Sequence, residues 1–251
     1  MDAETRQLQQ RLTAAGQLPE VLLLKQITTS TNDDVRELAS KGVQRVLVSS
    51  RQQTHGRGQR ERPWISPEGN IYLSTLLATN IAIDGRLALE IALNILQMPA
   101  LQGLKLQVKW PNDLYSLQGK WGGILVEPLS AEQAIVGVGI NLKAVVDVQI
   151  EQQTSSLQQL GLGPIDRTEL LAQLYLAIQQ AGEWFNHNSY NLAARFNHYA
   201  AFKELPVELE HATGVSSGIF KGIDNSGAIY IETAEGLTQF FQGRLRRAVA
   251  E

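Results

Sequence analysis

The 251-residue chain contains no cysteine. It can therefore form no disulfide, use no thiolate as a nucleophile and hold no zinc ion through cysteine ligands. Its four histidines, His55, His187, His198 and His211, are scattered along the sequence without metal-ligand spacing. This scatter argues against a transition-metal site.

The chain also lacks long apolar runs and an excess of positive charge. No apolar run approaches the roughly 18 residues that a membrane helix requires. The N-terminus carries Asp2, Glu4 and Arg6 before any apolar stretch and is not a signal peptide. We therefore expect a cytoplasmic protein without membrane contact. The formal net charge of -3 weakens a nucleic-acid-binding interpretation.

A length of 251 residues with 43% hydrophobic side chains allows one well-filled core and a small second domain. The apolar patterns predict an α+β fold divided into residues 1–204 and a β-rich unit at 205–251. The predicted helices are 2–18, a segment from Thr31 to near Gly42, 83–98, and 166–201 with a break at 186–191. The predicted strands of the first unit are 21–27, 45–50, 71–79, 104–110, 124–127 and 133–142. About five short strands at 205–250 are expected to close into a small antiparallel barrel.

The run 53–64, Gln-Thr-His-Gly-Arg-Gly-Gln-Arg-Glu-Arg-Pro-Trp, has no apolar period and reads as a mobile surface loop between two strands. Its glycines allow close backbone approach to a ligand, and guanidinium groups bind phosphate or carboxylate oxygens in forked pairs. Arg57, Arg60 and Arg62 therefore predict an anion site. A solvated basic loop and a nucleic-acid-binding segment are the alternatives.

Three further clusters carry polar or glycine residues beyond what a turn needs. Ser30, Thr31 and Asn32 stand at a helix start, where they either cap the helix, with Thr31 and Asp34 as the capping pair, or bind a polar ligand. Lys109 and Lys120 flank the turn at 111–113 and the glycines at 122–123. Gly137 and Gly139 share one face of a strand, which leaves either a ligand slot or a packing contact against a helix.

In this order along the chain, these motifs closely resemble the biotin protein ligases. The resemblance runs from about residue 26 to the C-terminus and indicates a short form without an N-terminal DNA-binding domain. It is carried by Ser30-Thr31-Asn32, Gln53 with Gly56-Arg57-Gly58, the segment 64–67, Lys-Trp-Pro-Asn-Asp at 109–113, Lys120 with 122–127, and 137–141.

The resemblance implies a catalytic domain like that of class II aminoacyl-tRNA synthetases, with a mixed or antiparallel sheet packed with helices, and a C-terminal barrel like Src-homology-3 domains. It implies that biotin's carboxylate attacks the α-phosphorus of Mg-ATP to give biotinyl-5'-adenylate. A lysine of the biotin carboxyl carrier protein of acetyl-CoA carboxylase then takes the biotinyl group. The implied protein is a monomer or homodimer that binds no nucleic acid.

The family positions also imply residue roles. The catalytic group is Lys120, Arg57 and Asp113, with Asp113 either assisting the phosphate and Mg²⁺ chemistry or orienting the lysine amine. The biotin site is implied at Ser30, Thr31, Asn32, Gln53, Gly56, Arg57, Lys120, Gly123, Gly137 and Gly139. The ATP or adenylate site is implied at Arg57, Gln59, Arg60, Arg62, Trp64, Lys109, Asn112 and Asn141. No metal ligand is assigned, although Mg²⁺ is expected with ATP near Asp113.

Three positions depart from the family pattern. Gln59 stands where many relatives have arginine, Glu61 replaces a usual glycine, and Arg244 follows Gly243 where an acidic residue is frequent. Lipoate ligases and octanoyltransferases resemble the same catalytic domain, but the Gly-Arg-Gly loop, the Lys-Trp-Pro-Asn-Asp turn and the C-terminal strands favour biotin.

Overall fold

The computed structural model describes residues 2–145 and 152–248, which form two β-sheets with helices packed on the larger one. The mixed α+β class predicted from the sequence is confirmed. The helices are α1 (Ala3–Ala14), α2 (Thr31–Ser40), α3 (Arg86–Leu96), α4 (Arg167–Asn186) and α5 (Leu192–Tyr199), with short 3-10 turns at Gln59–Glu61 and Pro99–Leu101.

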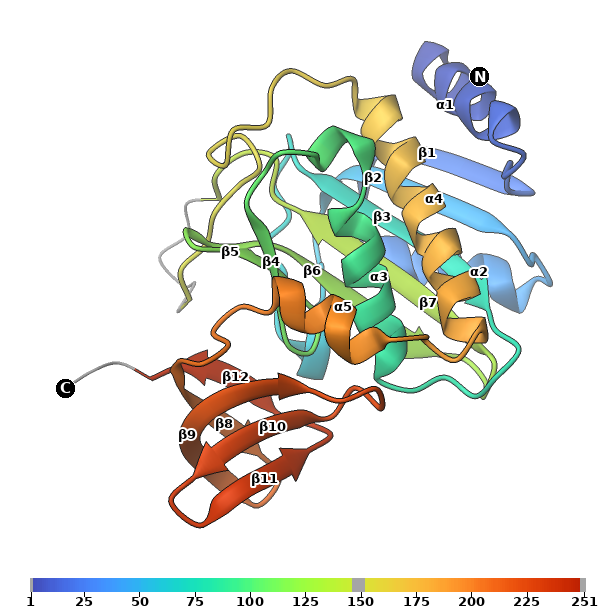
Figure 1. The fold of residues 1–251 in the computed structure, drawn as a ribbon. Helices are drawn as coiled ribbons and strands as arrows, with labels where there is room; N and C mark the ends of the chain where they lie inside the picture. Colours follow the sequence, from blue (N-terminus) through green and yellow to red (C-terminus); the bar gives the residue numbers. More distant parts are fainter. Residues whose placement is uncertain (1, 146–151, 249–251) are drawn as a thin grey trace.

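The larger sheet has seven strands in the order β1-β2-β3-β7-β6-β5-β4 (Figure 1). Only β1 and β2 among these neighbours run parallel, and the other pairs are antiparallel. The strands are β1 (Val21–Thr28), β2 (Val46–Gln53), β3 (Ile71–Ala78), β4 (Leu106–Lys109), β5 (Asp113–Ser116), β6 (Gly119–Pro128) and β7 (Gln133–Ile140).

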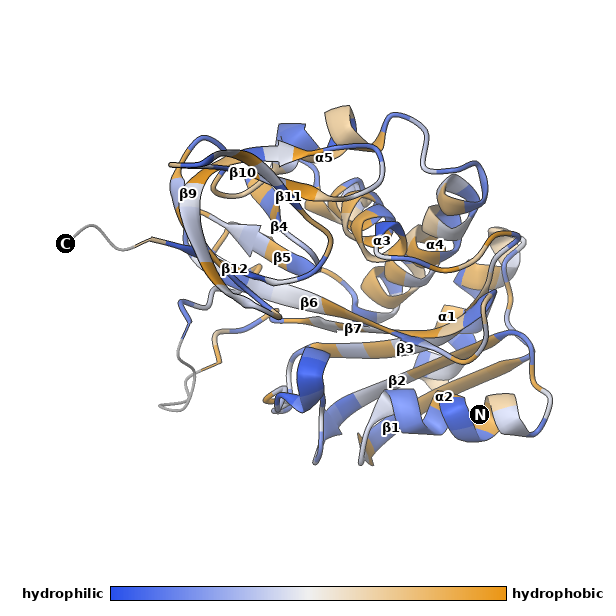
Figure 2. Ribbon diagram, turned by 90° about the horizontal axis from the view of Figure 1, so that it is seen from below, coloured by the Kyte–Doolittle hydropathy of each residue, from blue (hydrophilic) through white to orange (hydrophobic). Residues whose placement is uncertain are grey.

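Helices cover both faces of this sheet, as the view in Figure 2 shows. Helix α2 packs on β2, β3 and β7, where Val35 of the helix meets Val46 and Val48. Helices α3 and α4 lie against the opposite face. Because side chains alternate between the faces of a strand, Leu47 belongs to the core under α3 and α4 while its neighbours face α2.

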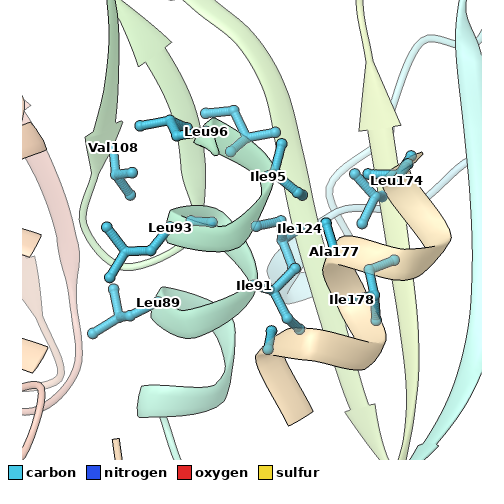
Figure 3. Packing of buried hydrophobic residues seen from close by; sticks show 14 of the residues in the cluster. Leu89, Ile91, Leu93, Ile95, Leu96, Val108, Ile124, Leu174, Ala177 and Ile178 are labelled. Carbon is cyan, nitrogen blue, oxygen red and sulfur yellow. The ribbon is translucent and has the colours of Figure 1, made fainter. Parts of the chain in front are cut away.

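The main core lies between α3, α4 and the sheet (Figure 3). Ile91 and Ile95 of α3 project toward Ile124 of β6, with Leu174 and Ile178 of α4 beside them. These side chains are essentially fully buried. Burial of each side chain contributes about 1.5–3 kcal/mol to the stability of the fold. The core therefore fixes the positions of β6 and β7, which carry polar residues of the site.

The second sheet contains five antiparallel strands in the order β11-β10-β9-β8-β12. They are β8 (Pro206–His211), β9 (Gly214–Ile223), β10 (Ile229–Thr233), β11 (Gly236–Phe240) and β12 (Arg244–Arg247). The last strand returns to pair with the first, but no pairing joins β11 to β12 among the described residues. The closed barrel predicted from the sequence is therefore not confirmed, and residues 249–251 of that predicted unit lie outside the described residues.

Hydrogen bonds from Trp110, which follows β4, and from helix α5 fasten the second sheet to the rest of the chain. The indole Nε1 of Trp110 donates to the carbonyl of Gly227 over 3.0 Å. Asn197 of α5 both donates to the carbonyl of Ile223 and accepts from its amide. The second sheet is thus held at the end of β4, directly beside Lys109.

The turn predicted at 111–113 is present at 110–112, but two strand assignments were incomplete. Asp113 already begins β5, which was not predicted, and β6 begins at Gly119, so that Lys120 and both following glycines lie inside a strand. Pairing with β5 and β7 overrides the weak strand propensity of glycine. In the part of the chain that the structure describes, no helix is long and apolar enough to cross a membrane.

Candidate active site

A cavity of about 380 Å³ opens where the ends of β4, β6 and β7 meet the N-terminus of α2, the loop at 53–64 and β12. It brings together most of the predicted site residues. Those lining it are Ser30, Thr31, Asn32, Gln53, Arg57, Gln59, Arg62, Trp64, Lys109, Asn112, Asp113, Lys120, Gly123, Gly137 and Gly139.

Two lysines and one aspartate form the charged centre of the cavity. Lys109 and Asp113 are partners across the β4–β5 pair, and their Nζ and Oδ2 atoms are 2.7 Å apart. Lys120, from the adjacent strand β6, places its Nζ 2.5 Å from the other oxygen, Oδ1. The carboxylate therefore holds two ammonium groups close together in a largely buried wall.

The surroundings shift the pKa values of this cluster. Burial alone would raise the pKa of the Asp113 carboxyl, but the charges of Lys120 and Lys109 outweigh it and hold the pKa below its ordinary range. Burial lowers the pKa of Lys109; Asp113 offsets part of that shift, and the nearby positive charges of Lys120 and Arg244 add to it. The carboxylate is thus ionised at neutral pH and keeps two cations in place where an anion can bind.

The N-terminus of α2 supplies the neutral polar end of the cavity. Ser30, Thr31 and Asn32 are all buried, and the amide of Thr31 donates to Oε1 of Gln53 over 2.9 Å. The predicted capping pair of Thr31 and Asp34 is wrong, because Ser30 is the N-cap and makes no side-chain capping bond. The Asp34 carboxylate instead accepts from Lys25 and Thr28.

The loop at 53–64 folds into a small hairpin rather than converging all three arginines on the cavity. Gly58 and Arg62 are joined by a backbone hydrogen bond, and Trp64 donates back to the carbonyl of Gly56. Its tip holds Arg60 and Glu61, both with φ of 56°. This left-handed conformation favours glycine, so Arg60 and Glu61 both add backbone strain to the loop.

Arg57 makes a forked ion pair with Asp33 on the first turn of α2, with distances of 2.9 and 2.5 Å. This hydrogen bonding raises the pKa of Arg57 and lowers that of Asp33. Arg62 also lines the cavity, but Arg60 is exposed at the hairpin tip and does not. The ATP-binding role of Arg60 therefore stays a prediction.

The two glycines of β7 leave room that other side chains fill. A Cβ on Gly139 would lie 2.5 Å from Nε1 of Trp64, and one on Gly137 would collide with the amide of Asn32. The indole also approaches Gly123 and lies under the ammonium of Lys120, whose Nζ is 5.1 Å from the ring centroid. The alternative of a packing contact against a helix therefore describes Gly137, since Asn32 belongs to α2.

Two more predicted residues do not line the cavity. Gly56 is buried inside the hairpin, where a Cβ would meet Ser66 and the Trp64 carbonyl at 2.5 Å. Asn141 is 5% exposed and its amide donates to the carbonyl of Ser155 over 3.2 Å. Both therefore have structural roles in this conformation. Asn112 lines the cavity, although its amide is bound to the carbonyl of Ile124.

The sequence reasoning missed several wall residues from distant parts of the chain. Gln152, together with Gly243 and the first two residues of β12, Arg244 and Leu245, also lines the cavity. Gln152 belongs to none of the sequence motifs. Arg244 is one of the positions that depart from the motif pattern, but only the packing of the second sheet places it in the cavity wall.

Comparison with known proteins shows which proteins this chain is similar to. Residues 24–141 match the model of the biotin/lipoate A/B protein ligase family. A biotin–[acetyl-CoA-carboxylase] ligase of Paracoccus denitrificans is 30% identical over 235 residues, which cover 83% of this chain and 93% of that protein. The bifunctional ligase/repressor BirA of Salmonella typhimurium is 33% identical over 210 residues.

The chain spans 65% of the length of that BirA protein. Among solved structures, the biotin protein ligase from Aquifex aeolicus in complex with biotin and ATP matches with a TM-score of 0.78 and 27% identity, over 91% of this chain and all of that one. Over residues 2–145 of this chain, helix α1 is the only element before β1, so no DNA-binding module lies there.

Proposed function

Because the chain belongs to the biotin protein ligase family, we propose that it activates biotin with ATP and transfers the biotinyl group to a lysine of a carrier protein. The observation that carries this proposal is the Lys109–Asp113–Lys120 cluster in the wall of a cavity that Arg57 and Arg62 also line. Two anionic substrates have to meet, and such a wall supplies the positive charge that lets them approach.

In the first step a biotin carboxylate oxygen bonds to the α-phosphorus of ATP, the bond from that phosphorus to the bridging oxygen breaks, and pyrophosphate leaves. Lys120 and Lys109 are placed to stabilise the negative charge on the oxygens around the reacting carbon and phosphorus. Asp113 keeps both ammonium groups within 2.7 Å of itself and thereby fixes their positions. The lysines therefore need no reorganisation as charge develops.

In the second step the carrier lysine amine attacks the acyl carbon, the bond to the AMP oxygen breaks, and AMP leaves with the electron pair while the amine loses a proton. The Trp64 indole and the hairpin residues Arg57, Gln59 and Arg62 line the cavity and would exclude water from the mixed anhydride. We assign to Asp113 the role of holding the two lysines, and leave to experiment whether it also orients the incoming amine.

Mg²⁺ enters this scheme as part of the Mg-ATP substrate. Among the described residues no group of three or more acidic or histidine side chains could hold the ion alone. Both oxygens of Asp113 are already engaged by lysines. The ion would accordingly be bound mainly by phosphate oxygens and water, which suits its preference for octahedral oxygen ligands.

The individual substrate contacts remain proposals. We propose that Ser30, Thr31, Asn32 and Gln53 bind the ureido ring. Gly137 makes room for Asn32 beside that ring, and Gly123 and Gly139 would allow the ring to approach the sheet where Trp64 now lies. We further propose that Gln59, Arg62 and Trp64 contact the nucleotide, with Arg57 released from Asp33 to bind an anion. The roles first implied for Gly56, Arg60 and Asn141 would require movement of the hairpin or of the segment around Ser155.

The finer points of architecture are also proposals. A catalytic domain at 1–204 like that of class II aminoacyl-tRNA synthetases is supported by the seven-stranded, mostly antiparallel sheet with helices on both faces. A C-terminal domain at 205–251 like Src-homology-3 barrels is supported by the pairing of β12 with β8. The carrier domain of acetyl-CoA carboxylase as partner, a monomeric or dimeric state, a cytoplasmic location and the absence of nucleic-acid binding stay predictions.

The proposal is tested by incubating the protein with Mg-ATP and labelled biotin and looking for a labelled adenylate and pyrophosphate. A biotin carboxyl carrier domain added afterwards should take up the label on one lysine. Parallel reactions with lipoate and octanoate cover the related activities within the family. Adenylate formation from either of those acids, without formation from biotin, would reject the proposal.

We expect Arg244→Ala to raise the KM for ATP by about 10-fold or more, the scale of one lost hydrogen bond to a charged group. Arg244 lines the cavity beside Lys109, and its charge acts on that lysine. Biotin affinity should not change. Arg246→Ala is the matched control, because Arg246 is half-exposed on the same strand and pairs with Glu210 at 3.8 Å outside the cavity. Equal ATP dependence in the two variants would contradict the assignment.

A further inference from the structure

A continuous chain of hydrogen bonds runs behind the polar end of the cavity. Asn32 donates from Nδ2 to Oε2 of Glu127 over 2.8 Å, and its Oδ1 lies 2.6 Å from the hydroxyl of Ser74. The same hydroxyl is 2.6 Å from Oγ1 of Thr31. Thr31 and Asn32 line the cavity, whereas Ser74, at 0% exposure on β3, does not reach it.

The direction of each bond follows from the carboxylate at one end. Glu127 also accepts from the guanidinium of Arg36 at 3.1 Å, so it acts as an acceptor toward Asn32. The Asn32 amide nitrogen must therefore face Glu127, which turns its oxygen toward Ser74. Ser74 has one proton and gives it to that oxygen, because two oxygens 2.6 Å apart without a proton between them would repel each other.

The hydroxyl of Ser74 can then only accept from Thr31. The Thr31 hydroxyl consequently donates its hydrogen bond to Ser74. Its longer contact of 3.1 Å with Oε1 of Gln53 then carries no proton, because the hydroxyl has only one and gives it to Ser74; that oxygen accepts from the Thr31 amide. The orientation of Gln53 is fixed in the same way, because its Nε2 donates to Ser66, which gives its proton to the Trp64 carbonyl.

We infer that Ser74 and Glu127 are positioning residues that make the Thr31 hydroxyl a hydrogen-bond acceptor toward the ligand. This inference rests on the proposed function and deepens it. The polar end of the cavity selects a ring that presents an N–H at this point, as a cyclic urea does. A cyclic carbamate with oxygen at the same place sets two acceptors against each other and is rejected, because Thr31 has no proton to offer.

The test is equilibrium binding of biotin and of two analogues in which one or the other ureido N–H is replaced by oxygen, without ATP. The wild-type chain should bind one of the two analogues at least 10-fold more weakly than biotin, the scale expected for an unpaired acceptor. In Ser74→Ala the Thr31 proton is no longer held by Ser74 and is shared between the ligand and Oε1 of Gln53, 3.1 Å away. The affinity for biotin should then fall about 10-fold while the affinity for the same analogue rises, so that the two dissociation constants come within about threefold of each other.

Two further variants support the interpretation. Glu127→Ala frees the Asn32 amide to rotate and should shift the ratio of analogue to biotin affinity in the same direction. Because the Glu127 side chain is 22% exposed, we expect this substitution to disturb folding less than Ser74→Ala does. Ser49→Ala is the matched control, because Ser49 is similarly buried on β2 and does not line the cavity; its hydroxyl donates to the backbone carbonyl of Tyr72 over 2.8 Å. It should leave the ratio unchanged.

Adenylate formation at saturating biotin separates positioning from chemistry. Ser74→Ala should keep kcat within about threefold of wild type, since the lost contact acts through ligand binding. The inference is overturned if the wild-type chain accepts both analogues as well as biotin, or if Ser74→Ala and Glu127→Ala both retain its discrimination. Discrimination in binding without any adenylate from ATP would count against the proposed reaction alone and would uphold the positioning role.

Discussion

Lys120→Met should slow biotinyl-adenylate formation by about 100-fold or more, the usual scale for losing a preorganised charge stabiliser. Lys120 projects from β6 into the cavity, where its Nζ is held 2.5 Å from Asp113 and lies over the Trp64 ring. Methionine replaces the lysine side chain as far as Cε and removes only the ammonium group, so that it retains an apolar side chain beside the indole. The fold should persist, because Asp113 keeps Lys109 as a partner.

Single-turnover measurement of adenylate formation, with ATP and biotin both saturating, gives this rate directly. Lys221→Met is the control, since Lys221 pairs with Glu204 and Glu232 on the second sheet and does not line the cavity. A rate for Lys120→Met within a few-fold of the control would remove Lys120 from the chemical step.

Asp113→Asn should both destabilise the protein and impair catalysis. Breaking a buried charge cluster by removing one partner typically costs about 3–5 kcal/mol, because the remaining charges are left uncompensated. Here two ammonium groups, on side chains only 9% and 14% exposed, would face each other without the carboxylate between them. The pKa of Lys109, already lowered by burial, should fall further in the variant.

The effect on stability has a defined pH dependence. The pKa of Asp113 is lower in the folded chain than its ordinary value of 3.8, so the unfolded chain binds the proton more readily. The stability that Asp113 contributes is therefore fully present above 3.8 and is lost as the pH falls through the folded-state pKa. Urea unfolding should show a large, constant difference between wild type and Asp113→Asn above about pH 5 that shrinks below pH 3.8. A difference independent of pH would contradict the ionised role of Asp113.

Much of the fold was predictable because it rests on local patterns. The apolar spacing of 83–98 and the strand predicted at 133–142 correspond to α3 and β7 within a few residues. β5 was missed because it is only four residues long and starts inside a turn signal. The start of β6 was missed because glycines disfavour strands unless neighbouring strands pair with them, which is information from the tertiary structure.

The site shows the same division. Lys109, Asp113 and Lys120 were predicted from motifs, but their mutual contacts depend on the register of β4, β5 and β6. The pairing of Arg57 with Asp33 was not foreseen, because it joins residues 24 positions apart through the fold of the hairpin. Ser74 stands in the apolar run 71–78, and a polar residue in a fully buried strand is a signal that could have directed attention to it.

The placement of Trp64 makes the site observable without a label. Its indole lies between Gly139 and the ammonium of Lys120, and its Nε1 has no hydrogen-bond partner among the described residues. Trp110 and Trp121 are buried with their N–H groups bound to carbonyls, and Trp184 packs under Arg195 on the far helices. A ligand entering the glycine slot must displace or cover Trp64, so intrinsic fluorescence should change on binding, and that change should disappear in Trp64→Phe.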